Sequence, residues 1–193
     1  MHHADMAMRD HVRPDGSVVH IASHDITNGE VIETIAGQGY GVGSSWSRGQ
    51  RWALYGFVLS YIHTGETKYL DMAKRVADYF IANVCDDYLP KCDFRAPETP
   101  VIYDSTAGAC TACGLIEIAK CVPQYEKKMY LNAAIKLLRA MDEKFCDWSE
   151  NTDALLQYGT EMYYSGIHMP IIYGDYFYAE ALYKLKGFEM LFW

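Results

Sequence analysis

The sequence predicts an all-α fold of the α/α toroid type, and three observations support this prediction. Apolar segments long enough to form helices alternate with amphipathic segments of similar length. A short turn joins each apolar segment to the amphipathic one that follows it. The motif at 69–73 recurs at 130–134, so one helical hairpin occurs twice at an offset of 61 positions (130 minus 69). An inner ring of helices covered on both sides, within an outer ring that has one wet face, explains this alternation; a helical solenoid is the structural alternative.

A β-hairpin-like excursion is expected near residues 17–35, before the first helix of the ring. Asp-Gly and Asn-Gly turn signals, at 15–16 and 28–29, flank short apolar runs at 18–21 and 31–35. We place this excursion at the mouth of the helical ring.

The first helical hairpin begins at Trp46. A helix from there to about His63 is apolar nearly all round, which predicts burial on most sides. The amphipathic helix expected over 66–84 has one charged face and therefore one wet side. Thr64-Gly65 forms the turn between them, with Gly65 suited to the left-handed position that ends a helix.

The second hairpin begins near residue 104, where Asp104 or Ser105, both residue types that commonly cap helices, is expected to be the cap. Small and apolar residues then continue to about residue 119, and an amphipathic helix is expected over 124–145. A further helix, expected over 175–186, follows a turn at Gly174, and its first residue is a second candidate cap.

Composition restricts the classes of protein to which this chain can belong. With 193 residues, half of them hydrophobic, it is expected to form one domain over 1–193. Lys and Arg total 17 against 25 Asp and Glu, a net charge of -8, which argues against a nucleic-acid partner. No run approaches the roughly 18 to 20 apolar residues of a membrane span, and the first residues do not resemble a signal peptide, so a cytoplasmic protein without a membrane partner is expected.

The six cysteines are expected to be free and mostly buried thiols, because a chain of this length does not need disulfides for stability. Cys110 and Cys113 have the C-x-x-C spacing. No second pair or histidine cluster follows at the distance of a zinc ribbon, so the sequence predicts no metal and no cofactor.

The most informative stretch is the run from Trp46 to Trp52, which sets two indoles and a guanidinium at helical spacing. Arg48 and Trp52 stand four residues apart, so they are expected to share one helix face. An indole offers a flat apolar face to a sugar ring, and a guanidinium can bind a carboxylate through two parallel N–H groups. Because a buried guanidinium needs an anion, the partner of Arg48 must be a ligand carboxylate or an internal aspartate. The run predicts a site for an acidic sugar.

Several motifs carry a family resemblance in both content and order: Arg13-Pro14-Asp15-Gly16-Ser17, His20, Gln38-Gly39, the run from Trp46 to Trp52, and Gly174-Asp175-Tyr176-Phe177. This ordered set resembles the unsaturated glucuronyl hydrolases, glycoside hydrolase family 88, of which the chain matches about the C-terminal half. The resemblance implies an (α/α)6 barrel and an enzyme that releases a 4,5-unsaturated uronic acid from the oligosaccharides left by polysaccharide lyases. The unsaturated rhamnogalacturonyl hydrolases share this chemistry and are an alternative.

By position, the resemblance implies a substrate-binding set of five residues: His20, Gln38, Trp46, Arg48 and Trp52. The family often has histidine where Gly37 stands here, which weakens the polar part of the expected site. The two aspartates that carry the family's chemistry lie upstream of the matched region, so no catalytic residue is predicted in this chain. A non-catalytic uronate-binding fragment or truncated gene product is therefore a further alternative, and half a toroid is expected to self-associate through its exposed inner-helix surface.

For each of these residues there is also a purely structural interpretation. The two tryptophans could be core packing, and His20 could be a hydrogen-bonded hairpin residue. A tyrosine cluster at 158, 163, 164 and 173 could line a second sugar subsite, although packing between loops is the simpler account.

Overall fold

The computed structural model describes residues 1–189 and 191, which form six helices and one two-stranded antiparallel sheet. In chain order the elements are α1 His2–Asp10, β1 Ile21–His24, β2 Val31–Ile35, α2 Ser47–Thr64, α3 Thr67–Asn83, α4 Ser105–Cys121, α5 Gln124–Lys144 and α6 Ile172–Leu185. The predicted helical hairpins are α2 with α3 and α4 with α5.

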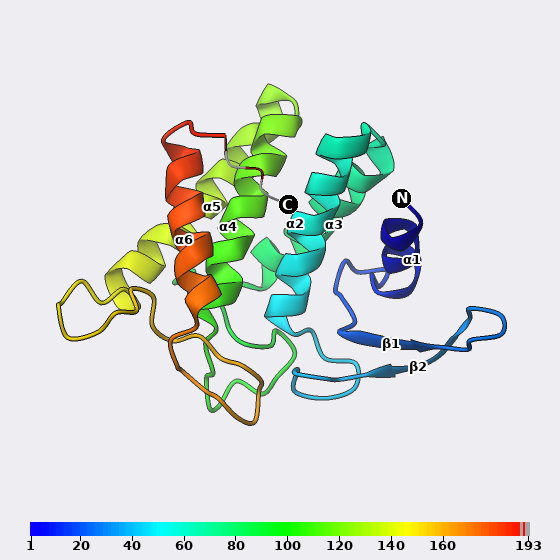
Figure 1. Cartoon of the computed structure of the whole chain (residues 1–193), viewed down its shortest axis with the longest axis horizontal. Coiled ribbons are helices and arrows are strands. Elements are labelled where there is room, and N and C mark those ends of the chain that lie inside the picture. Colours follow the sequence, from blue (N-terminus) through cyan, green and yellow to red (C-terminus); the bar gives the residue numbers. More distant parts are fainter. Residues whose placement is uncertain (190, 192–193) are drawn as a thin grey trace.

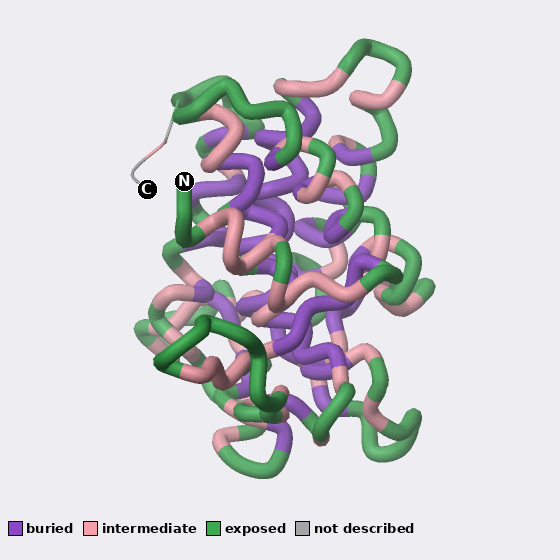
Figure 2. Tube along the Cα trace, turned by 90° about the vertical axis from the view of Figure 1, so that its right-hand side faces the viewer, coloured by how far each residue is buried: buried purple, intermediate pink, exposed green. Residues whose placement is uncertain are grey.

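The helices form two layers, as the alternation in the sequence predicted. Figure 1 shows α2, α4 and α6 side by side, with α3 and α5 behind them and the β-hairpin extending below α1. The middle helix α4 is buried at every position from Ser105 to Ala119, because α2, α5 and α6 all pack against it. Outer helices such as α3 bury one side only. The buried positions concentrate in the central helices, and the loops carry most of the exposed ones (Figure 2). The α/α toroid prediction is confirmed.

Close packing of the inner layer depends on small residues. A Cβ atom at Gly114 of α4 would lie 2.2 Å from Leu54 Cδ2 and 3.2 Å from Tyr55 Cα, so glycine allows α2 and α4 to approach closely. This explains why the apolar sequence of α4 is rich in small residues.

The predicted ends of the helices are partly right. Gly65 ends α2 in the left-handed conformation, with φ of 75°. Asp104 caps α4, accepting a hydrogen bond from the Thr106 amide. The expected start of the last helix was wrong: α6 begins at Ile172, so Gly174 lies inside the helix. Asp175 is therefore not a cap, and its carboxylate instead accepts the backbone N–H groups of 155 and 156 in the preceding loop.

The hairpin excursion is confirmed, but its first strand begins later than the apolar pattern indicated. Ile21 pairs with Ile35 at one end of the sheet and His24 with Val31 at the other. Val18 precedes the strand and is buried, its backbone N–H donating to Gln50 Oε1 of α2 at 2.9 Å. The sequence prediction also missed α1, whose nine residues include none that is buried.

An ion cluster, made of Glu117, Glu180, Lys184 and Tyr55, lies within the apolar inner layer and was not anticipated. Lys184 Nζ lies 2.6 Å from Glu117 Oε1 and 3.4 Å from Glu180 Oε1. The Tyr55 hydroxyl donates to Glu180. Because all four residues are buried, this cluster joins α2, α4 and α6 through charge as well as apolar packing.

Candidate functional site

The first turn of α2 and the segments leading into the β-hairpin enclose a groove of about 340 Å³. Four of the five predicted site residues line it, and Arg48 does not. The lining residues are His11, Val18, Val19, His20, Gln38, Trp46, Gly49, Trp52 and Ala53. Residues from four separate segments, with sequence positions from 11 to 53, therefore form one concave surface beside the apolar wall of α2.

Trp46 forms one wall of this groove at the N-cap position of α2, where it is only 5% exposed. The His20 ring lies against it, with 4.2 Å between ring centroids and a tilt of 32°. Gly49 lets the indole lie close against the first turn of the helix, since a Cβ there would lie 3.2 Å from Trp46 Cε3. The indole and the imidazole thus support each other as a packed pair.

A hydrogen bond from the Gln38 backbone indicates which ring nitrogen of neutral His20 carries the proton. His20 Nδ1 lies 2.9 Å from the Gln38 N–H and 3.3 Å from the Ala36 carbonyl; because the Gln38 N–H can only donate and is the nearer of the two, Nδ1 is assigned as an acceptor and the ring proton to Nε2. Burial lowers the pKa of His20, as do the positive charges of His11 and Arg48, while the Ala36 carbonyl opposes the shift. His20 is therefore neutral at pH 7 and can donate from Nε2.

This arrangement predicts a pH dependence of stability. The folded pKa of His20 lies below the unfolded value of about 6.5, so its contribution is complete above pH 6.5 and is lost as the pH falls below it. We expect the melting temperature of the wild type to fall more between pH 7 and pH 5 than that of His20→Gln, measured by circular dichroism. Equal losses in the two proteins would show that another group is responsible.

Gln38 connects the groove to the loop before α6. Its side-chain amide donates to the Glu161 backbone carbonyl at 2.8 Å, and the Gln38 backbone carbonyl accepts the Tyr163 N–H at 2.9 Å. These two contacts join segments 123 residues apart in the chain and fix the Gln38 side chain at the groove. The sequence did not predict that this loop supports the site.

Arg48 has an internal carboxylate as its partner, the second of the two alternatives that the sequence left open. Its guanidinium is 4% exposed, with Nε 3.0 Å from Asp104 Oδ2, and it also donates to the Tyr173 hydroxyl and the Thr160 carbonyl. Its carbon Cζ lies 5.2 Å from the centroid of the Trp46 ring. Arg48 therefore lies behind the groove wall and contacts Trp46 from there.

Trp52 is 46% exposed at the groove edge. Arg48 and Trp52 lie four residues apart on α2 as expected, but the cation over the Trp52 ring is Arg51, whose Cζ lies 3.9 Å from the Trp52 centroid. Arg51 itself is fully buried. Phe177 of α6 makes an edge-on contact with Trp52 at 5.7 Å, so α6 also supports this side chain. The i, i+4 spacing was correct, but the two side chains lie in different environments.

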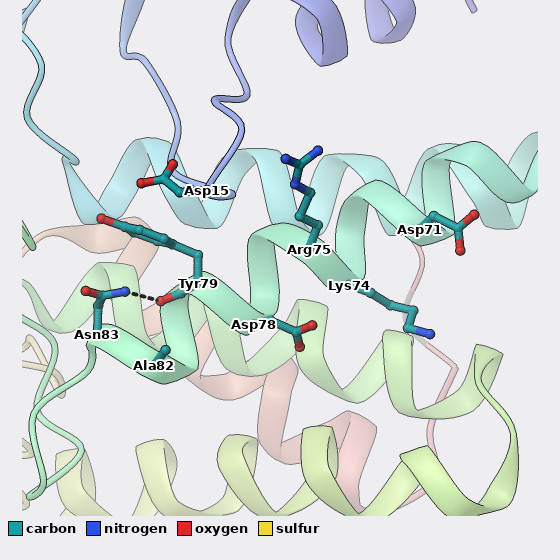
Figure 3. Close-up of a pocket in the computed structure, with 8 residues that line it drawn as sticks. All are labelled: Asp15, Asp71, Lys74, Arg75, Asp78, Tyr79, Ala82 and Asn83. Atoms are coloured by element: carbon teal, nitrogen blue, oxygen red, sulfur yellow. Dashed lines mark hydrogen bonds between the residues drawn. The ribbon is translucent and has the colours of Figure 1, made fainter.

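Another surface depression, of about 510 Å³, lies on the outer face of α3 and is shown in Figure 3. Three of its charged side chains have other partners: Lys74 pairs with Glu126 at 2.5 Å, Arg75 donates to the Pro14 carbonyl, and Asp15 pairs with Arg95. It lacks exposed indoles or histidines, so the smaller groove is the better candidate for a sugar site.

The cysteines do not contribute to the groove lining. All six are free, and Cys110 and Cys113 are completely buried on α4. Burial raises the pKa of Cys110 to about 11, so the thiol stays protonated at neutral pH.

Comparison with known proteins gives a consistent family relationship. The chain is 35% identical over 197 aligned positions to the unsaturated glucuronyl hydrolase of Bacillus sp. strain GL1, covering 99% of this chain and 52% of that protein. It is 30% identical to the unsaturated chondroitin disaccharide hydrolase of Streptococcus pneumoniae strain R6, covering 94% of this chain and 48% of the relative. No family model matches the chain.

Solved structures agree with the sequence relatives. The crystal structure of the Bacillus sp. GL1 enzyme superposes with a TM-score of 0.89 at 35% identity, over 95% of this chain and 50% of that one. A Streptococcus agalactiae unsaturated glucuronyl hydrolase complexed with dGlcA-GalNAc6S gives 0.83 at 30% identity, over 94% and 50%. The chain spans about half the length of the relatives it matches, consistent with a C-terminal half, and the resemblance inferred from the motifs is confirmed. None of the described helices is both long and apolar enough to cross a membrane.

Proposed function

From this match to about half of an unsaturated glucuronyl hydrolase, we propose that the chain forms the substrate-binding half of a glycoside hydrolase site. The substrate is an oligosaccharide that ends in 4,5-unsaturated glucuronic acid, the product of a polysaccharide lyase acting on a glycosaminoglycan or a similar polymer. The relatives are an unsaturated glucuronyl hydrolase and an unsaturated chondroitin disaccharide hydrolase, which supports this substrate class.

The observation that carries the proposal is the meeting of His20, Gln38, Trp46 and Trp52 in one groove. The exposed indole of Trp52 can pack on the apolar C–H side of a pyranose, and neutral His20, held against Trp46, donates from Nε2 to a carboxylate or hydroxyl oxygen. Arg48, implied by the family resemblance to bind substrate, is better explained as a positioning residue, because Asp104 already occupies its guanidinium. It holds Trp46 from behind.

The proposed reaction is hydration of a vinyl ether. A carboxylic acid protonates C4 of the C4=C5 double bond, water adds at C5 of the resulting oxocarbenium ion and returns a proton, and the hemiketal opens to release the neighbouring sugar. None of the residues that line the groove carries a carboxyl group. The proposal therefore assigns no proton donor among the lining residues and gives this groove the substrate-binding part of the site.

Binding can be tested by calorimetry with an unsaturated chondroitin disaccharide, and turnover by the loss of its C=C absorbance. We expect binding without turnover, and affinities about tenfold or more weaker for both groove variants, because Trp52→Ala removes an exposed stacking face and Trp46→Ala removes the buried wall against which His20 packs. Trp148→Ala, an exposed indole away from the groove, is the matched control and should bind normally. Unchanged affinity in both groove variants would contradict the proposed site, and turnover would contradict the missing proton donor.

We further infer that the isolated chain self-associates through the open side of its inner layer. Exposed apolar side chains recur along one face of α6 at Ile172, Tyr176, Ala179 and Tyr183, next to the edge of α2 that carries Trp52. The chain covers 50% of the Bacillus sp. GL1 structure, and a second copy would offer a matching apolar helical layer for this exposed face.

Sedimentation velocity tests the association. Wild type is expected to form dimers at micromolar concentration, and Tyr183→Glu to shift the equilibrium toward monomer by about tenfold, because it places a charge in the interface. Tyr125→Glu is the control, since Tyr125 is exposed on the outer helix α5. A wild-type chain that stays monomeric at about 100 μM would refute the inference, because that concentration is about tenfold above the dissociation constant of a weak dimer.

A further inference from the structure

A loop rich in glycine, Gly39 to Ser45, connects two of the groove residues, Gln38 and Trp46. Its conformation therefore determines how far apart these two side chains lie. The loop has no regular secondary structure of its own. Its shape must come from contacts with the rest of the molecule.

One buried carboxylate, that of Asp93, binds both ends of this loop. Oδ2 accepts the Tyr40 N–H at 3.0 Å, and Oδ1 accepts the Ser45 N–H at 3.0 Å. The Arg95 N–H donates to the same Oδ1 at 2.9 Å, which fixes the carboxylate relative to its own segment. Asp93 is only 1% exposed, so these charge-assisted bonds are shielded from water.

The backbone around Asp93 reinforces the link to α2. Trp46 pairs with Asp93 in an isolated antiparallel bridge, and the Phe94 N–H donates to the Ser45 carbonyl at 2.9 Å. One residue further on, the Ser47 N–H donates to the Cys92 carbonyl at 2.9 Å. The segment that carries Asp93 therefore lies alongside the last residues of the loop and the start of the helix.

The loop closes tightly on the carboxylate. A Cβ atom at Gly39 would lie 2.8 Å from Asp93 Oδ2 and 2.6 Å from Ser44 Oγ. Only glycine at this position allows the loop backbone to come so close. Bulk at position 39 would push the loop away from Asp93 and change the spacing of Gln38 and Trp46.

We propose that Asp93 is a positioning residue of the uronate groove: by binding the Tyr40 and Ser45 amides it sets the separation of Gln38 and Trp46. This inference rests on the proposed function. Displacements of about 1 Å in a binding constellation cost large factors in affinity or rate, so a carboxylate that fixes a connecting loop acts on substrate without touching it.

The test is Asp93→Asn, which replaces one acceptor oxygen by an NH₂ group of the same size. The single amide oxygen of asparagine can accept either the Ser45 and Arg95 N–H groups or the Tyr40 N–H group. It cannot accept all three at once. We expect about tenfold weaker binding of the unsaturated chondroitin disaccharide, with faster hydrogen exchange confined to the amides near Tyr40 or Ser45. The matched control is Asp147→Asn, because Asp147 accepts the N–H of the residue two positions on, Ser149, at 2.9 Å, away from the groove.

Gly39→Ala provides a second variant that leaves the carboxylate in place, and it decides the matter if Asp93→Asn does not fold. It should also bind about tenfold more weakly while its melting temperature stays within a few degrees of wild type. If Trp46→Ala loses affinity but both loop variants keep it, Asp93 is not a positioning residue. If Trp46→Ala keeps affinity as well, the proposed function itself fails.

Discussion

Asp104→Ala is expected to lower the free energy of unfolding by about 3–5 kcal/mol, measured by urea denaturation, because it removes one partner of a buried ion pair. Arg48 would keep its charge at 4% exposure with no carboxylate. The same substitution removes the acceptor of the Thr106 and Thr160 amides, so it also uncaps α4 and releases the loop before α6.

A double variant separates the stability lost with the buried ion pair from the stability lost with the N-cap of α4. Asp104→Ala combined with Arg48→Met removes both charges, so its loss should be smaller than the sum of the two single losses by more than about 1 kcal/mol. Asp147→Ala, which removes only a surface turn acceptor, should cost within about 0.5 kcal/mol. A loss under 1 kcal/mol, roughly the value of an exposed pair, for Asp104→Ala would mean that the pair is not buried in solution.

Lys184→Met is the second substitution with a large expected effect. It leaves Glu117 and Glu180 facing each other without the ammonium that lies 2.6 and 3.4 Å from their oxygens. Because these side chains are almost completely inaccessible to water, the expected loss is about 3–5 kcal/mol in the free energy of unfolding. Thermal and urea denaturation should both report it.

The chain contains a matched control for this substitution. Lys120 Nζ lies 3.1 Å from the same Glu117 oxygen, but its side chain is 33% exposed. Water competes for this ammonium, so Lys120→Met should cost no more than about 1 kcal/mol. Equal losses for the two lysines would show that burial does not determine the contribution of this cluster.

The sequence predicted the fold well where burial imposes a pattern. The helices α2 to α5 appeared within a few residues of their bounds, because each has either a continuous apolar sequence or one apolar face. The helix α1 buries no residue completely and so has no such pattern. The start of α6 was missed because Gly174 suggests a turn; the glycine is in fact needed for packing, since a Cβ there would lie 2.9 Å from Thr106 Cγ2.

The site was predictable in content but not in detail. The motifs identified His20, Gln38, Trp46 and Trp52, which meet in one groove. Spacing alone could not show that Arg48 binds Asp104, 56 positions away, because such pairing depends on how the hairpins pack. An aspartate that caps a helix and an arginine on an apolar helix were both visible in the sequence as separate features. Their three-dimensional pairing was the missing information.

The two equivalent tyrosines of the repeated hairpin suggest an order of assembly. Tyr69 of α3 donates its hydroxyl to Asp5 of α1 at 2.9 Å, and Tyr130 of α5 donates to Asp78 of α3 at 3.3 Å. In both cases an outer helix binds an acid on the outer helix that precedes it in the chain. The acceptor of each tyrosine is therefore synthesised before the tyrosine itself. The helices can pack one after another in chain order as the protein is synthesised.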